Sequence, residues 1–245
     1  MAALLETKDL AKRFGGLSAV DGVSFALAPG EIRGVIGPNG AGKTTLLNLI
    51  SGVYPPTGGE IRLDGEPLAG LAPHRLARKG LIRSFQVARL FGNMSVLDNL
   101  MVPYLAARRG TGAATAAEEA ARLLELTRLA PLAQSPAKAL SGGQRALLQI
   151  AAGFMAPQLR CYLLDEPFAG VSPAIKDSIV DLIEAHNRER RTTFIIVSHE
   201  MALVRRLCPR VTVMIEGRIG AEGALDEVAG KDEVIGAYLG KVSAT

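Results

Sequence analysis

The sequence predicts an α/β protein built on a parallel sheet, with a block of helices inserted into the middle of the chain. Two observations carry this prediction. Over residues 161–218, short apolar segments alternate with helical ones, as strands and helices alternate in a parallel sheet. Residues 31–37, EIRGVIG, form an apolar strand that leads directly into a glycine-rich loop and a helix.

The chain has 245 residues, enough for one large domain or for a domain with a subdomain. From about residue 87 to 157 the pattern is helical alone, whereas strands prevail before this block and alternate with helices after it. We therefore expect one domain over residues 1–245, with a core of about 1–86 and 158–245 and a helical subdomain of about 87–157.

The individual elements follow from apolar spacing and from the turn residues between them. Strands before the helical block are expected at residues 4–14, 20–30, 31–37, 58–68 and 80–86. A helix at 43–52 follows the glycine-rich loop. Helices of the block are expected at 95–109, 116–129 and 142–155, with a flexible connector at 110–115. Beyond the block, strands at 161–167, 192–200 and 210–218 alternate with helices at 173–191 and 202–208.

Composition excludes several classes of protein. The net charge is +4, but lysine and arginine are dispersed, so a nucleic-acid groove is not expected. Cys161 and Cys208 lack metal-ligand spacing, which predicts reduced thiols. No segment approaches the roughly 20 apolar residues of a membrane span, so any membrane connection should run through a partner.

The glycine-rich loop fits the pattern G-x-x-x-x-G-K-[ST], between a strand and a helix as that pattern requires. Glycines let the backbone wrap a phosphate, and successive N–H groups form an anion nest. Lys43 should bridge the β- and γ-phosphates, and the Thr44 hydroxyl should ligate Mg²⁺. The candidate nucleotide-binding residues here are Gly37, Pro38, Asn39, Gly40, Ala41, Gly42, Lys43, Thr44 and Thr45.

A second group of candidates follows the ends of strands. The apolar segment CYLL delivers Asp165 and Glu166 at its carboxyl end, where α/β proteins place their ligand chemistry. Asp165 should hold Mg²⁺ through water, and Glu166 should orient and polarise the attacking water. Gln86, at the end of its expected strand, could reach Mg²⁺ or that water, and His199 could contact the γ-phosphate.

Residues 139–149, ALSGGQRALLQ, indicate a second anion-binding helix start. Ser141, Gly142 and Gly143 immediately precede an apolar-periodic run, so they place a hydroxyl and backbone N–H groups at the positive end of a helix dipole. One chain therefore carries two candidate phosphate sites, of which the first already looks complete.

In this order, these segments resemble the motifs of the ATP-binding-cassette (ABC) ATPase family over nearly the whole chain. The matches are Walker A at Gly37–Thr45, the Q-loop at Gln86, the LSGGQ signature at Leu140–Gln144, Walker B at Cys161–Asp165, the catalytic glutamate at Glu166 and the switch histidine at His199. The resemblance implies a P-loop NTPase core, with a RecA-like parallel sheet and an antiparallel N-terminal β part. It also implies ATP and Mg²⁺ as cofactors, with catalysis by Glu166, His199, Lys43 and Gln86 and metal contacts by Thr44, Gln86 and Asp165.

The resemblance further implies a head-to-tail pair of ATPase subunits. In such a pair the signature of one chain covers the nucleotide on the Walker A loop of the other, which accounts for two phosphate sites in one sequence. The signature residues are Leu140, Ser141, Gly142, Gly143 and Gln144. The family also implies an aromatic ring that stacks on adenine, and Phe14 is the candidate, with membership of the core as its alternative.

Two positions depart from the family pattern. Ser172 stands in the D-loop where Asp is common, which weakens any expectation of a cross-dimer contact there. The segment after the signature, RALLQIAAGFM, lacks most of the arginines usual in the family.

Two segments are similar to the ATPase subunits of branched-chain amino-acid importers: RFGGLSAVDGVSF and RSFQVARLFGNMSVLDNL. The alternatives are the ATPase of a lipopolysaccharide-export-like ABC system and an ABC ATPase outside transport. About 55 residues separate Gln86 from the signature, too few for the long coiled-coil arm of the latter class. Glu166 and His199 argue against a non-catalytic ATP-binding subunit, and a P-loop kinase has no use for LSGGQ.

The partner surface is expected just after Gln86. Apolar side chains there resemble the groove that receives a coupling helix of a membrane subunit, and helix-in-groove docking needs such anchors. They are Val87, Leu90, Phe91 and Met94, whose alternative role is the subdomain core. The expected partners are a second ATPase subunit (a copy or a paralogue), transmembrane permease subunits and, indirectly, a substrate-binding protein, with no nucleic acid. The expected location is peripheral, at the cytoplasmic face of the inner membrane.

Overall fold

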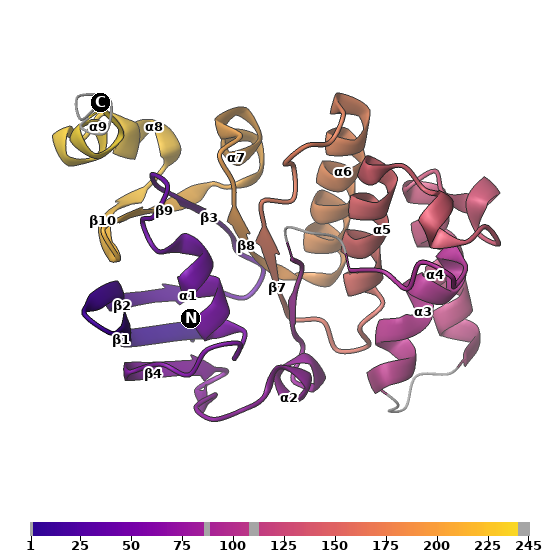
Figure 1. The fold of residues 1–245 in the computed structure, drawn as a ribbon, viewed down its shortest axis with the longest axis horizontal. Coiled ribbons are helices and arrows are strands. Elements are labelled where there is room, and N and C mark those ends of the chain that lie inside the picture. The colour runs from indigo at the N-terminus through magenta and orange to yellow at the C-terminus, as the bar shows by residue number, and fades with distance from the viewer. Residues whose placement is uncertain (1, 86–88, 108–112, 240–245) are drawn as a thin grey trace.

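A computed structural model describes residues 2–85, 89–107 and 113–239 (Figure 1). Six strands form the main sheet: β3 (Ile32–Ile36), β6 (Leu81–Arg83), β7 (Cys161–Asp165), β8 (Thr193–Val197), β9 (Arg210–Ile215) and β10 (Arg218–Gly223). Their order is β10-β9-β3-β8-β7-β6, with every neighbouring pair parallel except β9 and β10. All residues of β3, β7 and β8 are buried, as expected for parallel strands covered on both faces.

A second, antiparallel sheet is formed by the first strands of the chain. Its members are β1 (Leu5–Phe14), β2 (Leu17–Leu27), β4 (Gly58–Leu63) and β5 (Glu66–Pro67), in the order β2-β1-β4-β5. Buried and exposed residues largely alternate along β2 and β4, so one face of this sheet is buried. That face shares a core with α1 (Lys43–Ile50) and with one face of the main sheet, through residues such as Leu5, Leu46 and Val197.

Besides α1, the helices of the described residues divide into three from the middle of the chain and five from the rest of it. The first group is α3 (Val96–Ala107), α4 (Ala113–Leu126) and α5 (Gly142–Phe154). The others are α2 (Pro73–Arg78), α6 (Pro173–Arg190), α7 (Met201–Leu207), α8 (Leu225–Ala229) and α9 (Asp232–Leu239). Figure 1 shows α3, α4 and α5 at one end of the molecule, with α6 between them and the strands.

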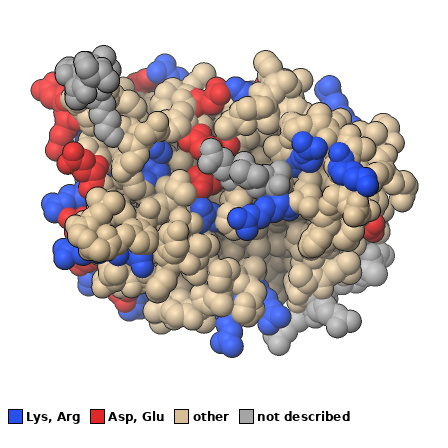
Figure 2. Space-filling model, viewed as in Figure 1, with Lys and Arg blue, Asp and Glu red and all other residues tan. Residues whose placement is uncertain are grey.

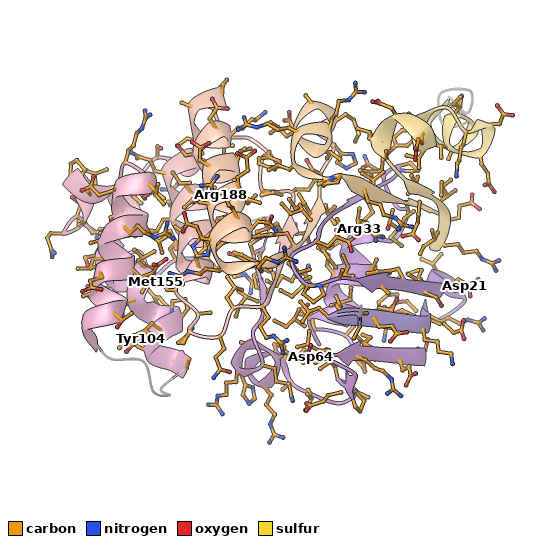
Figure 3. The ribbon with its side chains drawn as sticks, turned by 180° about the vertical axis from the view of Figure 1, so that it is seen from behind. Asp21, Arg33, Asp64, Tyr104, Met155 and Arg188 are labelled. Carbon is orange, nitrogen blue, oxygen red and sulfur yellow. The ribbon has the colours of Figure 1, made fainter. Side chains whose placement is uncertain are left out.

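One core cluster joins this helical end to the main sheet. It contains Leu100 of α3, Leu123 of α4, Leu147 of α5 and Ile183 of α6 together with Phe194 of β8, all fully or almost fully buried. In the view from behind (Figure 3), the labelled Tyr104 and Met155 lie on the helical side, and Arg33 lies among the strands. The helix α5, which follows the signature, therefore shares one apolar core with α6 and with the main sheet.

The predicted fold class is confirmed, because a mainly parallel sheet is combined with an antiparallel N-terminal sheet. Several boundaries were wrong. The strand expected at 80–86 ends at Arg83, and the one expected at 58–68 divides into β4 and β5. Residues 113–115, expected in a connector, begin α4, which ends before Arg128 at a left-handed backbone (φ 57°). The sequence also did not predict α2, α8 or α9, which are short helices.

Two further sequence expectations bear on chemistry. Cys161 and Cys208 are free and buried, and burial raises the pKa of each thiol to about 12, so both are inert. Among residues 2–85, 89–107 and 113–239, no helix combines the length and the hydropathy needed to span a bilayer.

Candidate active site

The glycine loop connects β3 to α1 and needs glycine at particular positions. Gly37, Gly40 and Gly42 have φ values of 147°, 80° and 98°, which other residues rarely adopt. A Cβ on Gly37 would lie 2.2 Å from the carbonyl oxygen of Met214, and one on Gly42 would lie 2.3 Å from that of Ala19. The loop backbone therefore lies directly against β9 and β2, and this close packing holds its N–H groups in place.

Lys43 begins α1 and is buried, with its side chain folded along the loop. Its Nζ donates hydrogen bonds to the carbonyl oxygens of Gly37 (2.7 Å) and Pro38 (3.0 Å). The ammonium group thus lies at the N-terminus of a helix, inside a loop of positive-φ glycines. This combination of a cation, backbone N–H groups and a helix dipole suits a phosphate.

Thr44 and Asp165 approach each other although they are far apart in sequence. Asp165 ends β7, is 4% exposed, and its Oδ1 accepts a hydrogen bond of 3.5 Å from Thr44 Oγ1. A hydroxyl and a carboxylate are hard oxygen donors of the kind that Mg²⁺ prefers. In the part of the chain that the structure describes, no cluster of three His, Cys, Asp or Glu side chains offers a metal site. A magnesium ion at this pair therefore fits only with phosphate and water oxygens as its other ligands, which is its usual environment.

Glu166 and His199 form the second pair at this edge of the sheet. Glu166 has a left-handed backbone (φ 50°), a conformation that is uncommon for residues other than glycine. Its Oε1 lies 3.2 Å from His199 Nε2, and its Oε2 accepts a 3.3 Å hydrogen bond from the backbone N–H of His199. Burial raises the pKa of Glu166, and the charges of His199 and Lys43 oppose this rise. A carboxylate with a raised pKa is better suited to accept a proton at neutral pH.

A cleft of about 950 Å³ brings these residues together. Candidate residues in its lining are Phe14, Asn39, Gly40, Ala41, Gly42, Lys43, Thr44, Thr45, Glu166 and His199. Gly37, Pro38 and Asp165 are not part of the lining and lie behind it, in contact with Lys43 and Thr44. Gln86 lies outside the described residues.

Phe14 lies at the end of β1, with 43% of the residue exposed, so it is not part of the core. Its ring meets Tyr54 edge to face, with 5.4 Å between centroids, and Lys12 Nζ lies 5.1 Å from its centroid. These contacts fix the ring in the wall of the cleft, where an aromatic face can receive a planar ligand.

The signature segment lies outside the lining of this cleft. Leu140 is 3% exposed and anchors the segment in the core, whereas Ser141 and Gly142 are exposed. Ser141 caps α5: its hydroxyl accepts from Gln144 N (3.3 Å), and Gln144 Oε1 accepts from Ser141 N (2.9 Å). This capping box stabilises the helix start, and Gly143 lies close to Ile175 of α6.

Two of the four residues expected at the partner surface line one groove. Leu90 and Phe91 line a groove of about 230 Å³ together with Phe85, Pro103 and Tyr162. Phe91 is 57% exposed, and Met94, which is 37% exposed, lies outside the groove lining. Val87 lies outside the described residues.

Two functional candidates were missed in the sequence. Gln149 Nε2 donates to the carbonyl oxygen of Phe85 (2.7 Å), and its Oε1 accepts from Arg89 N (2.7 Å), so one side chain joins α5 to both flanks of residues 86–88. Arg83 donates to Asp165 at 2.9 Å. The available signals were a polar residue in the apolar run after the signature and a charged residue in the strand LIRSF.

Charged side chains of both signs are spread over the face seen in Figure 2, and acidic and basic groups adjoin near its centre.

Comparison with known protein families matches residues 20–169 to the family described as ABC transporter. The chain is 39% identical to the high-affinity branched-chain amino acid transport ATP-binding protein BraF of Pseudomonas aeruginosa, covering 97% of this chain and 98% of BraF. It is 37% identical to the protein of the same description, LivG, of Escherichia coli, with the same coverage.

The solved structures that resemble this chain include ATP-binding cassettes. The ADP conformation of an ATP-binding cassette of an ABC transporter superposes with a TM-score of 0.86 at 29% identity, covering 98% of this chain and 100% of that one. A dimeric post-hydrolysis state of another ATP-binding cassette, bound to ADP and Pi, superposes with a TM-score of 0.79 at 25% identity, covering 90% and 98%.

Proposed function

This chain belongs to the ABC transporter family, and we propose that it is the ATP-hydrolysing subunit of an importer for branched-chain amino acids. The observation that supports hydrolysis is the convergence of Lys43, Thr44, Glu166 and His199 on one cleft. The observation that supports this substrate class is the identity of 39% and 37% to BraF and LivG over almost their whole length.

The geometry of the cleft supports a catalytic role for each residue in this proposal. Lys43 and the loop N–H groups bind the β- and γ-phosphates, and Phe14 stacks on adenine. Thr44 and Asp165 would hold Mg²⁺, which when bound would offset the charge of the phosphates, and Gln86 is assigned to the same metal or to the attacking water. Glu166 orients that water and accepts its proton, while His199 holds the carboxylate at 3.2 Å.

The active unit in this proposal is a head-to-tail pair of ATPase subunits. The helical subdomain of about residues 87–157 carries Leu140–Gln144 to the cleft of the partner, where Ser141 and the N–H groups of the α5 start cap the γ-phosphate. Each site then needs both chains, so ATP holds the pair closed and hydrolysis loosens it.

The pair is proposed to act on transmembrane permease subunits at the cytoplasmic face of the inner membrane, with a substrate-binding protein connected only through them. The groove lined by Leu90 and Phe91 receives a coupling helix of the permease. Met94 is assigned to the edge of the same surface, and Val87, which lies outside the described residues, is assigned to the partner surface from the sequence alone.

Substrate class is tested by uptake in the source cells. Deleting the gene for this chain is expected to abolish uptake of radiolabelled leucine, isoleucine and valine at low external concentration, and plasmid-borne wild type restores it. Plasmid-borne Glu166→Gln is expected not to restore it. Unchanged uptake of all three, with loss of uptake of another solute, would contradict the assignment.

Docking is tested with Phe91→Glu. The variant is expected to keep the ATPase rate of the isolated subunit but to lose transport, because a carboxylate would replace an apolar anchor and would lose its hydration when the coupling helix docks. Leu105→Glu is the control, since Leu105 is 59% exposed on α3 and does not line the groove. Equal transport by the two variants would contradict docking at this groove.

A further inference from the structure

Arg83 is a buried cation for which the proposed reaction has no use. It is the last residue of β6, and its side chain is 5% exposed. A buried guanidinium is costly unless it is paired, so the partners of Arg83 indicate why it is there. Burial lowers its pKa, and the neighbouring Asp165 carboxylate opposes that shift.

The guanidinium joins two elements of the active site. Its Nη2 donates to Asp165 Oδ2 at 2.9 Å, at the end of β7. Its Nη1 donates to Asn48 Oδ1 at 2.5 Å and to Ser51 Oγ at 3.0 Å, both in the second half of the helix that begins with Lys43 or at its end. One planar fork therefore ties Asp165 to α1.

The geometry divides the two oxygens of Asp165 between two tasks. Oδ2 is held by Arg83, whereas Oδ1 faces Thr44 Oγ1 at 3.5 Å. The carboxylate plane is thus fixed with one oxygen directed at the other expected metal ligand.

We propose that Arg83 is a positioning residue that holds the carboxylate of Asp165 oriented for Mg²⁺ and keeps it in register with α1. This proposal rests on the proposed function, since it assumes a nucleotide in the cleft. Arg83 also lines the groove that contains Leu90 and Phe91, so the residue that holds Asp165 lies beside the proposed docking surface. Arg83 acts through Asp165 and does not itself touch the nucleotide.

The test measures metal dependence of nucleotide binding by the full chain. A fluorescent ADP analogue is titrated at a series of free Mg²⁺ concentrations and in EDTA. For Arg83→Met, the half-saturating Mg²⁺ concentration is expected to rise about tenfold or more, as when groups that orient metal ligands are removed. Affinity in EDTA is expected to stay within about twofold of wild type, because Arg83 touches no nucleotide-binding residue of the glycine loop.

Two variants keep the test decisive. Arg83→Lys retains a charge but lacks the fork that reaches Asp165, Asn48 and Ser51 together, so an intermediate rise is expected even if Arg83→Met does not fold. Arg62→Met is the control, because Arg62 forms an exposed ion pair with Glu60 and is expected to leave the Mg²⁺ dependence unchanged.

Two outcomes would overturn the proposal. A half-saturating Mg²⁺ concentration unchanged in a folded Arg83→Met, or in Arg83→Lys if the first does not fold, would show that Asp165 needs no positioning. A lower value would show that the guanidinium repels the metal. Absence of any Mg²⁺ effect in the wild type would instead contradict the proposed function, so the two failures are distinguishable.

Discussion

The glycine loop before α1 and the signature segment before α5 are both helix starts suited to an anion, yet their surroundings differ. The glycine loop faces a cleft of about 950 Å³ that also contains Glu166 and His199. At the signature, Ser141 and Gly142 are exposed and contribute nothing to the lining of that cleft. This difference favours the proposed pair, in which one chain supplies the lined cleft and the other supplies the exposed signature.

The largest expected effect separates ATP hydrolysis from ATP binding at the glycine-loop site. Glu166→Gln should lower steady-state ATP hydrolysis about a thousandfold, because the amide cannot accept the proton of the attacking water. ATP binding and ATP-driven dimerisation should persist, since the hydrogen bonds that hold Lys43 in the glycine loop run to Gly37 and Pro38 and not to Glu166. The measurements are phosphate release and gel filtration with ATP.

Glu60→Gln serves as the control for this experiment, since Glu60 is exposed and lies on β4. ATPase activity within about tenfold of wild type in Glu166→Gln would remove this carboxylate from the general-base role.

A polar cluster joins α4, one of the helices at the end of the molecule that carries the signature, to α6. Glu119 of α4 lies 2.5 Å from Arg190 Nη2, 3.0 Å from Arg122 Nη2 and 3.5 Å from His186 Nε2. Burial tends to raise the pKa of Glu119, but the hydrogen bonds from His186 and Arg122 and the charge of Arg190 outweigh it and lower the pKa to about 2.

Removing the negative charge of Glu119 tests how much the contact between α4 and α6 contributes to the free energy of unfolding. Glu119→Gln should lower the free energy of unfolding by about 2 kcal/mol at pH 7, as for hydrogen bonds to charged groups. Because the folded pKa lies below the unfolded value of about 4.5, this stabilisation is present above pH 4.5 and lost as pH falls toward 2.

Urea unfolding across this pH range provides the measurement, with Glu118→Gln, an exposed neighbour on the same helix, as the control. A difference between wild type and Glu119→Gln that does not shrink as pH falls from 4.5 would show that the ionised carboxylate is not responsible.

The smallest expected effect concerns the capping role of the signature serine. Ser141→Ala removes one half of the capping box and should cost about 1 kcal/mol of stability. Ser178→Ala is the control, because Ser178 is half-buried within α6 and caps no helix, and its hydroxyl bonds to the carbonyl oxygen of Ala174. Equal stability of the two variants in thermal unfolding would leave the exposed hydroxyl of Ser141 with no capping role.

The sequence could predict those parts of the molecule whose residues are adjacent in the chain. The glycine loop, the strand before it and the helix after it are adjacent in the chain, so spacing alone indicates their arrangement. Arg83 could not be interpreted in this way, since its partners Asn48 and Asp165 are 35 and 82 positions away. The capping box at Ser141 was predictable from S-x-x-Q, but the contacts of Gln149 with Phe85 and Arg89 depend on how α5 packs.

Some helices were missed, and the end of β6 was wrong, for a related reason. α2, α8 and α9 have five to eight residues each, too few for a periodic pattern to stand out from a loop. β6 was expected to reach Gln86, yet it ends at Arg83, the residue that turns into the interior to meet Asp165. Tertiary pairing, and not local preference, decides where that strand ends.

The central claim, that each catalytic site combines the glycine loop of one chain with the signature of another, is tested most directly by mixing two inactive variants. Lys43→Ala lacks the phosphate-binding ammonium, and Ser141→Arg blocks the signature. Neither should hydrolyse ATP alone, but each mixed dimer should contain one intact composite site, so the mixture should regain ATPase activity. A mixture that stays as inactive as its components, or full activity in Ser141→Arg alone, would contradict the claim.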